Sequence, residues 1–168
     1  MRFKGEHFTI RPVDEAQEAS AILEVYRQCE DFLSLGPVAV ASPEMVQADL
    51  RLSQEEGCTF CGIYDRQSNA MLGIIDFSTS GFNGDPALAF LSLLMIAAPF
   101  RGRGLGEAVV QAVEDEIRRA GQARAIESGV QVNNPGSIRF WQRMGYRIVS
   151  GPTSMPDGTT VYRLWKDL

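Results

Sequence analysis

One stretch, residues 88–121, constrains the fold of this chain more than any other. It opens with the apolar run LAFLSLLMI, which is long enough for a buried strand, and then passes through the glycine-rich segment RGRGLG. Apolar residues then recur at helical spacing, at Val109, Val110, Val113 and Ile117. The stretch therefore predicts a buried strand, a tight turn and an amphipathic helix in that order.

The turn between this strand and helix has the chemistry of an anion site. Its three glycines let the backbone approach a ligand closely, and the first amides of the helix have no intrahelical partners. A bound anion would also gain from the helix dipole. Arg101 and Arg103 add positive charge at the same place. The turn therefore predicts a phosphate or pyrophosphate ligand.

Two familiar phosphate-binding motifs do not fit this turn. A P-loop requires Gly-Lys followed by Ser or Thr, whereas Gly106 is followed by Glu107 and Ala108. A dinucleotide fingerprint requires a third glycine at position 107 or 109, where the chain has Glu107 and Val109. A nucleotide-binding protein is therefore disfavoured, and the pattern that remains is Arg-x-x-Gly-x-Gly.

Length, charge and the N-terminus limit the class of protein. The 168 residues contain no Pro/Ser/Gly-rich linker or repeat, so we expect a single domain over residues 1–168. A net charge of −5 without a basic cluster disfavours nucleic acid and anionic membrane surfaces as partners and leaves room for an amine substrate. The first residues lack the apolar core of a signal peptide, and no apolar run is long enough to span a membrane, so a cytoplasmic location is expected.

The three cysteines do not indicate a metal or redox site. Cys58 and Cys61 are spaced as in metal-binding pairs, but no second pair exists and His7 is the only histidine. Positions three apart in a strand lie on opposite faces. We therefore predict no metal and interpret the cysteines, Cys29 included, as buried reduced thiols.

The rest of the chain alternates between strand and helix signals. Strands are expected at residues 8–12, 59–64, 70–79, 124–132, 146–149 and 160–165. Helices are expected at residues 16–29, 44–54 and 137–144, with Ser42 as an N-cap and Gly145 as a C-cap. Residues 150–158 are expected to form a loop. The broken apolar segment 31–42 is too short for a core helix.

Two motifs in this order resemble the GNAT superfamily of N-acetyltransferases. The pattern at Arg101, Gly104 and Gly106 resembles the acyl-CoA pyrophosphate loop of that superfamily. A second run resembles the family pattern of Asn, a small residue, an aromatic residue and a Gly-aromatic pair, at Asn134, Ser137, Trp141, Gly145 and Tyr146. The resemblance extends from about residue 60 to the end of the chain.

The resemblance implies a fold and a cofactor site. The fold would be α/β, with a mixed, mostly antiparallel sheet flanked by helices and a central pair of parallel strands, 88–96 and 125–132, that splay apart. Acetyl-CoA would fill the split as a missing strand. Its predicted contacts are Leu94, Met95, Ile96, Arg101, Gly102, Arg103, Gly104, Leu105, Gly106, Glu107, Asn134, Ser137 and Trp141.

The resemblance also implies an activity. It predicts transfer of an acetyl group from acetyl-CoA to a primary amine of a small molecule or peptide, by direct attack of the neutral amine on the thioester. A non-catalytic acyl-CoA sensor or pseudo-enzyme is the alternative. The acceptor and the oligomeric state stay open, a homodimer being one of the states considered.

The chain departs from the family at the positions of its familiar acid and bases. Trp141 stands where a tyrosine commonly protonates the leaving thiolate, and an indole N–H is not a usable acid at neutral pH. Phe90 and Gly129 stand where family members place a glutamate. The catalytic proton transfers must therefore use other groups.

Three replacement bases can be named from the sequence. Glu127 lies two residues before Gly129 and so on the same face of its strand, which makes it the preferred catalytic candidate. Asp76 interrupts an apolar strand, and Ser92 could hold a water molecule. We carry all three forward.

Overall fold

The computed structural model describes the backbone of residues 1–168 and every side chain except those of Phe3 and Lys4. Within this described backbone, eight strands form one sheet in the order β1-β2-β3-β4-β5-β6-β8-β7. The strands are β1 (Phe3–Lys4), β2 (Phe8–Pro12), β3 (Thr59–Asp65), β4 (Met71–Ser78), β5 (Leu88–Ile96), β6 (Ala125–Gln131), β7 (Arg147–Ser154) and β8 (Thr160–Asp167). The helices are α1 (Glu15–Arg27), α2 (Glu30–Leu33), α3 (Pro43–Glu55), α4 (Leu105–Ala120) and α5 (Pro135–Arg143).

Short polar side chains begin three of these helices. Asp14, Ser42 and Asn134 each accept a hydrogen bond from a backbone amide in the first turn of α1, α3 and α5. Such N-caps satisfy amides that have no partner inside the helix. Helix α4 differs, because its N-cap is Gly104, which offers no side-chain oxygen.

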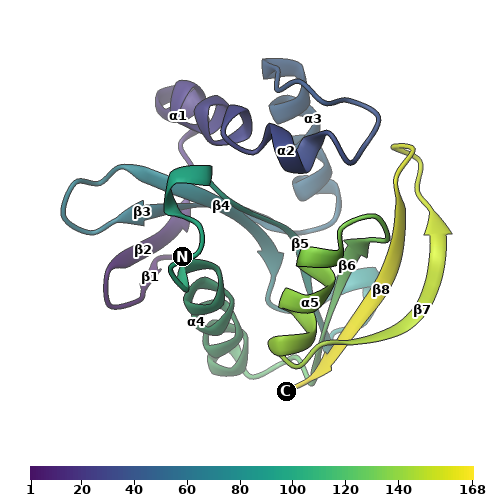
Figure 1. Cartoon of the computed structure of the whole chain (residues 1–168). Coiled ribbons are helices and arrows are strands. Elements are labelled where there is room, and N and C mark those ends of the chain that lie inside the picture. The colour runs from purple at the N-terminus through teal and green to yellow at the C-terminus, as the bar shows by residue number, and fades with distance from the viewer.

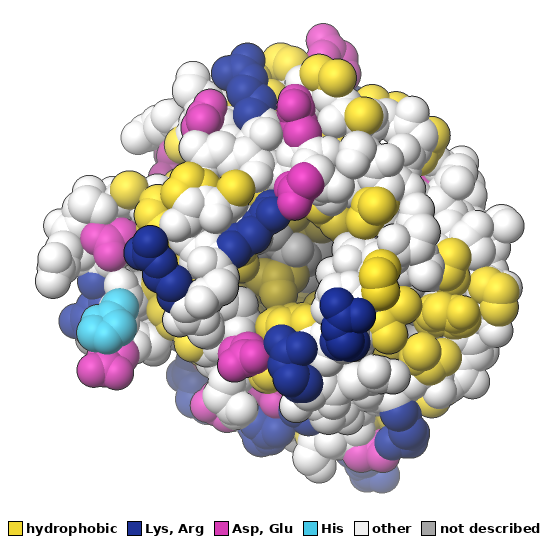
Figure 2. All heavy atoms as spheres, in the orientation of Figure 1, with side chains coloured by type: hydrophobic (Ala, Val, Ile, Leu, Met, Phe, Trp, Pro, Cys, Tyr) yellow, Lys and Arg dark blue, Asp and Glu magenta, His cyan; other side chains and the backbone are white. Residues whose placement is uncertain are grey.

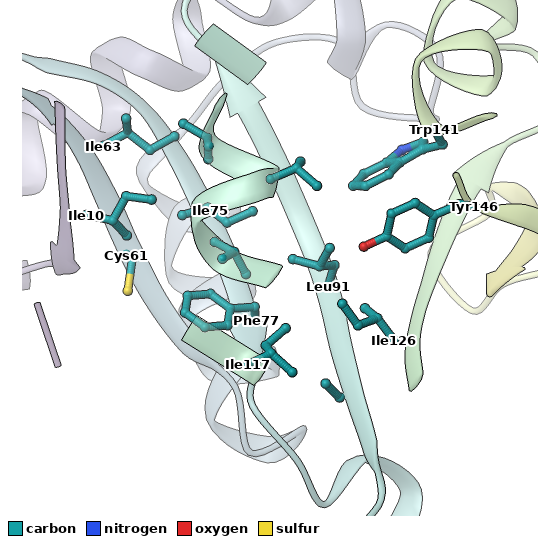
Figure 3. Packing of buried hydrophobic residues seen from close by; sticks show 14 of the residues in the cluster. Ile10, Cys61, Ile63, Ile75, Phe77, Leu91, Ile117, Ile126, Trp141 and Tyr146 are labelled. Atoms are coloured by element: carbon teal, nitrogen blue, oxygen red, sulfur yellow. The ribbon is translucent and has the colours of Figure 1, made fainter. Parts of the chain in front are cut away.

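The helices cover both faces of the sheet (Figure 1). Helices α1 and α3 pack on one face around Ile22, Val25, Tyr26, Ile74 and Met95. Helices α4 and α5 pack on the other face, over a larger apolar core that is shown in Figure 3. Burial of these apolar faces supplies most of the stabilisation of such a layered fold.

The centre of the sheet is the splayed pair that the sequence predicts. Strands β5 and β6 are parallel neighbours, whereas every other pairing between described strands is antiparallel. Their ladder runs from Leu88 with Ala125 to Leu91 with Ser128. Beyond that point β5 pairs with β4 and β6 pairs with β8. The Ser128 hydroxyl donates to the Leu91 carbonyl, 2.8 Å away, where the strands part.

Two local expectations were wrong. Residues 150–154, expected in a loop, extend β7, because β8 supplies backbone partners as far as Ser154. The segment 31–42, interpreted as too broken for a helix, overlaps the one-turn helix α2. The thiols of Cys29 and Cys61 are free and buried as expected, while Cys58 is free and half-buried.

Candidate active site

A cavity of about 760 Å³ occupies the split between β5 and β6 and the space beneath α3. Its walls come from α2, α3, β5, β6, α5 and the tip of the β7–β8 hairpin. Figure 2 shows a hollow near the middle of the molecular face, with an apolar floor and Lys or Arg side chains around its edge. The volume suits a small organic ligand.

The glycine-rich turn before α4 leaves its backbone open. Gly102 and Gly104 adopt the left-handed backbone conformation, with φ of 72° and 77°. A Cβ atom built on either residue would meet no other atom within 4 Å. The unpartnered amides at the start of the 16-residue helix α4 can therefore be approached by an anion.

Arg101 holds this turn against the α1–α2 segment. Its Nη1 lies 2.6 Å from Asp31 Oδ2, and its Nε donates to the Ile96 carbonyl at 2.6 Å. The carboxyl pKa of Asp31 is lowered by this guanidinium. Arg101 thus fixes the position of the turn, whereas the sequence interpretation took it as free charge for the ligand.

The beginnings of α4 and α5 lie close together at Gly106. A Cβ atom on Gly106 would stand 3.5 Å from the Phe140 ring and 3.8 Å from Ile96. Leu105 packs against the core on the α4 side of the sheet, and Glu107 pairs with Arg143 at 3.4 Å. The turn is therefore braced by α5 as well as by the end of β5.

The three β5 residues predicted to line the cofactor site differ in orientation. Leu94 lines the cavity. The Met95 side chain packs with the core beneath α1 and α3, and the Ile96 side chain packs towards α4. Only Leu94 among them can contribute its side chain to the cavity wall.

Helix α5 presents one face to the cavity. Asn134, Ser137, Phe140 and Trp141 all line it. The Asn134 Oδ1 is already engaged, since it accepts from the Ser137 amide at 3.0 Å. Trp141 is 7% exposed and makes an edge contact with Tyr146 at a centroid distance of 4.9 Å (Figure 3). Trp141 therefore shapes the wall with its ring.

Glu127, the preferred base of the sequence interpretation, is held outside the cavity lining. Its Oε2 pairs with Arg163 Nη2 at 2.7 Å. Its ladder neighbours are Phe90 on β5 and Trp165 on β8. The carboxylate is thus neutralised by a partner that the sequence interpretation did not foresee.

A different pair of carboxyls lines the cavity where β5 and β6 part. Asp76 is 3% exposed and accepts a hydrogen bond from Ser53 Oγ at 2.7 Å. Glu56 accepts from Ser92 Oγ at 3.3 Å. Ser92 has no counterpart on β4, because Phe77 is opposite Leu91 and Asp76 is opposite Leu93. This β-bulge places the Ser92 hydroxyl beside Glu56.

Burial changes the acidity of both carboxyls. Burial raises the pKa of Asp76 to about 6, with the charge of Glu56 contributing and the Ser53 hydrogen bond opposing. Burial also raises the pKa of Glu56, against the hydrogen bond from Ser92. Carboxyls with raised pKa in a cleft are candidates for proton transfer near neutral pH. Asp76 and Ser92 were named from the sequence, but Glu56 was not.

A family comparison decides the class of this protein. The model of the acetyltransferase (GNAT) family matches residues 20–146. The chain belongs to the GNAT family. Enzymes of this family use acetyl-CoA, so the activity class is acetyl transfer. No curated protein matches the chain.

Solved structures show the same GNAT fold. An acetyltransferase from Thermus thermophilus is 23% identical, with a TM-score of 0.76 and 100% of each chain covered. An acetyltransferase from Salmonella typhimurium that modifies the N-terminal serine of ribosomal protein L7/L12 is 19% identical, with a TM-score of 0.75 and 98% and 96% covered. The L7/L12 acetyltransferase RimL in complex with coenzyme A is 18% identical, with a TM-score of 0.74 and 100% and 98% covered.

Proposed function

We propose that this GNAT protein is an N-acetyltransferase that moves the acetyl group of acetyl-CoA to a primary amine by direct attack. The observation that carries the proposal is the position of Glu56 and Asp76. They line the same cavity as the split strands, at the point where β5 and β6 part. An amine in the cavity would therefore have proton acceptors next to a gap that suits the thioester.

The residues of the split fit acetyl-CoA along its length. We assign the pyrophosphate to the amides between Gly102 and Glu107, where the backbone is open. The pantetheine would lie along β5 at Leu94, opposite Asn134 and Ser137. Its amides can bond to strand edges that have no ladder partner there. Trp141 would close the wall beside the thioester.

The acceptor must lose its ammonium proton before it can attack. An alkyl ammonium has a pKa of about 10.4, so the neutral amine is scarce at pH 7. Glu56 and Asp76, with water held by Ser92, would take up a proton from the acceptor nitrogen. The nitrogen lone pair forms the C–N bond, the C–S bond breaks, and the sulfur keeps the electron pair and is protonated. Overall, ammonium and acetyl-CoA give the acetamide, CoA thiol and one proton.

Two acceptor classes and one alternative function stay within this proposal's test. The Salmonella neighbour acts on a protein N-terminus, which supports a peptide amine. The enclosed cavity supports a small amine. A sensor that binds acetyl-CoA without turnover is the alternative, and it would bind the ligand in the same split.

The test is release of CoA thiol in the presence of a panel of primary amines and peptides. Acetylation of at least one amine, with its product identified by mass spectrometry, is the expected result. Tight acetyl-CoA binding without turnover on any amine would favour the sensor and reject the enzyme.

Two variants locate the base within the same assay. Glu56→Gln should lower kcat at neutral pH by about 10- to 100-fold and matter less at high pH, where neutral amine is abundant. A loss seen with Glu127→Gln and not with Glu56→Gln would instead return the base to β6. The two carboxyls therefore predict opposite outcomes.

A further inference from the structure

The cavity wall is acidic beyond the two carboxyls assigned to proton transfer. Five of its described lining residues are carboxylic acids, and no described lining residue is Lys, Arg or His. The five are Glu44, Asp49, Glu56, Asp76 and Asp157. A cavity of one charge sign attracts ligands of the opposite sign.

The most enclosed of these carboxyls have neutral partners. Asp49 accepts from the Tyr26 hydroxyl at 2.6 Å, as Asp76 and Glu56 accept from serine hydroxyls. The ion pairs among the described side chains involve other carboxylates. Burial raises the pKa of Asp49, and the charge of Asp157 adds to that effect. The negative charge of this wall is therefore uncompensated by the protein.

A second observation also indicates a ligand that donates hydrogen bonds. Gln131 lines the cavity from β6, and its Oε1 is buried without a hydrogen-bond partner. Buried polar atoms without a partner are uncommon because they lose their water without compensation. An N–H group of a bound ligand would supply the missing donor.

The acids form two groups along α3. The inner acidic group is Glu56 with Asp76, beside the β5 bulge. The outer acidic group is Asp49 with Asp157, towards the tip of the β7–β8 hairpin. Asp49 and Glu56 are seven residues apart, two helical turns on one face, so the groups are separated by about 10 Å along the axis.

The wall between the two groups is apolar. Leu52 lies between Asp49 and Glu56 on the same face of α3 and is 47% exposed. Val38 and Met155, also exposed, line the cavity from the loop before α3 and from the hairpin tip. Such a surface suits a chain of methylene groups.

We infer that the acceptor is an aliphatic diamine or linear polyamine with two ammonium groups about 10 Å apart. The inference rests on the proposed acetyl transfer and names its substrate class. One nitrogen lies at the inner acidic group and is acetylated. The second keeps its charge and pairs with Asp49 and Asp157, while the methylenes cover Leu52.

The test compares three amines that offer the same nucleophile. Octamethylenediamine carries a second ammonium at the far end, octylamine carries a methyl group there, and tetramethylenediamine is too short to span the two groups. We expect kcat/KM for octamethylenediamine to exceed that of each of the others by tenfold or more. Equal values, or a preference for octylamine, would overturn the inference while leaving acetyl transfer intact. No turnover with any amine would reject the proposed function itself.

A matched pair of variants assigns the selectivity to the outer acidic group. Asp49→Asn should lower kcat/KM for octamethylenediamine about tenfold and bring its ratio to octylamine close to one. Glu24→Gln removes the same charge from an exposed position on α1 outside the cavity and should keep the ratio. A ratio that survives Asp49→Asn would refute the role of this carboxyl.

Discussion

Asp76 shows how one side chain can be both costly and useful. It interrupts the apolar run of β4, and its carboxyl is buried with hydroxyl donors. Burying a carboxylate without a cation disfavours the charged form. The same environment brings its pKa to about 6, where a carboxyl can exchange protons near neutral pH.

The stability of the Asp76→Asn variant tests this cost. The pKa of Asp76 is raised from 3.8 to about 6, so between these values the folded state binds the proton more tightly than the unfolded state. Stability therefore falls as pH rises through that window. Asparagine has no such proton and can still accept from Ser53. We expect the variant to be more stable at pH 7 by about 1–3 kcal/mol, measured by urea unfolding. Equal stability at pH 7 would contradict the assignment.

The pH–rate profile tests the use of Asp76. If this carboxyl accepts a proton, the rate rises with pH through a limb near 6, and Asp76→Asn removes that limb. Ser53→Ala provides the companion variant. It removes a hydrogen bond that lowers the pKa of Asp76, so the limb should move to higher pH. A limb that stays in place in both variants belongs to another group.

At the scale of elements, the start of α4 is built from the backbone. Gly104 takes the place of a capping side chain, and α5 and the end of β5 brace the turn. Arg101 contributes from the side by pairing with Asp31. The element therefore offers amides at a fixed place without a side chain in front of them.

Gly104→Val tests that element. Valine at a φ of 77° is strained and puts a side chain where the phosphate is proposed to lie. We expect the acetyl-CoA affinity to fall at least tenfold, measured by calorimetry. Gly81→Val is the matched control, since Gly81 has a φ of 82° with the same open surroundings. Comparable destabilisation with an affinity loss confined to Gly104→Val is the expected pattern. Equal affinities in both variants would reject the loop assignment.

At the scale of the whole molecule, a buried ion pair ties α4 to the last strand. Glu114 is fully buried, and Lys166 Nζ lies 2.8 Å and 2.7 Å from its two oxygens. Lys166 also donates to the Met144 carbonyl at the end of α5. The Tyr146 hydroxyl donates to the same carboxylate at 3.2 Å. Both helices of this layer thus meet β8 at one charged centre.

Lys166→Met should destabilise the fold by about 3–5 kcal/mol, because it leaves Glu114 as a buried charge with reduced compensation. Adding Glu114→Gln should recover part of the loss, since the amide oxygen can still accept from Tyr146. Urea unfolding of the two variants measures both effects. A double variant no more stable than Lys166→Met would show that the pair acts through packing and not through charge. The described helices include none long and apolar enough to cross a membrane.

What the sequence by itself determined is local. Hydrogen bonds between near neighbours set the caps at Asp14 and Ser42. The run of apolar residues and glycines from 88 to 121 set the strand, turn and helix that organise the GNAT fold. These features depend on residues a few positions apart, so periodicity and turn chemistry are sufficient to predict them.

The tertiary structure alone decided which charges meet. Arg101 pairs with Asp31, 70 residues away, and Glu127 is neutralised by Arg163 across the β6–β8 ladder. Glu56 reaches the cavity because α3 continues to Glu55 and a bulge turns Ser92 towards it. Such contacts depend on strand register and helix placement, which the packing of the whole core determines. For this reason the sequence alone predicted the strand, turn and helix of the split, while only the tertiary structure brought Glu56 beside Asp76.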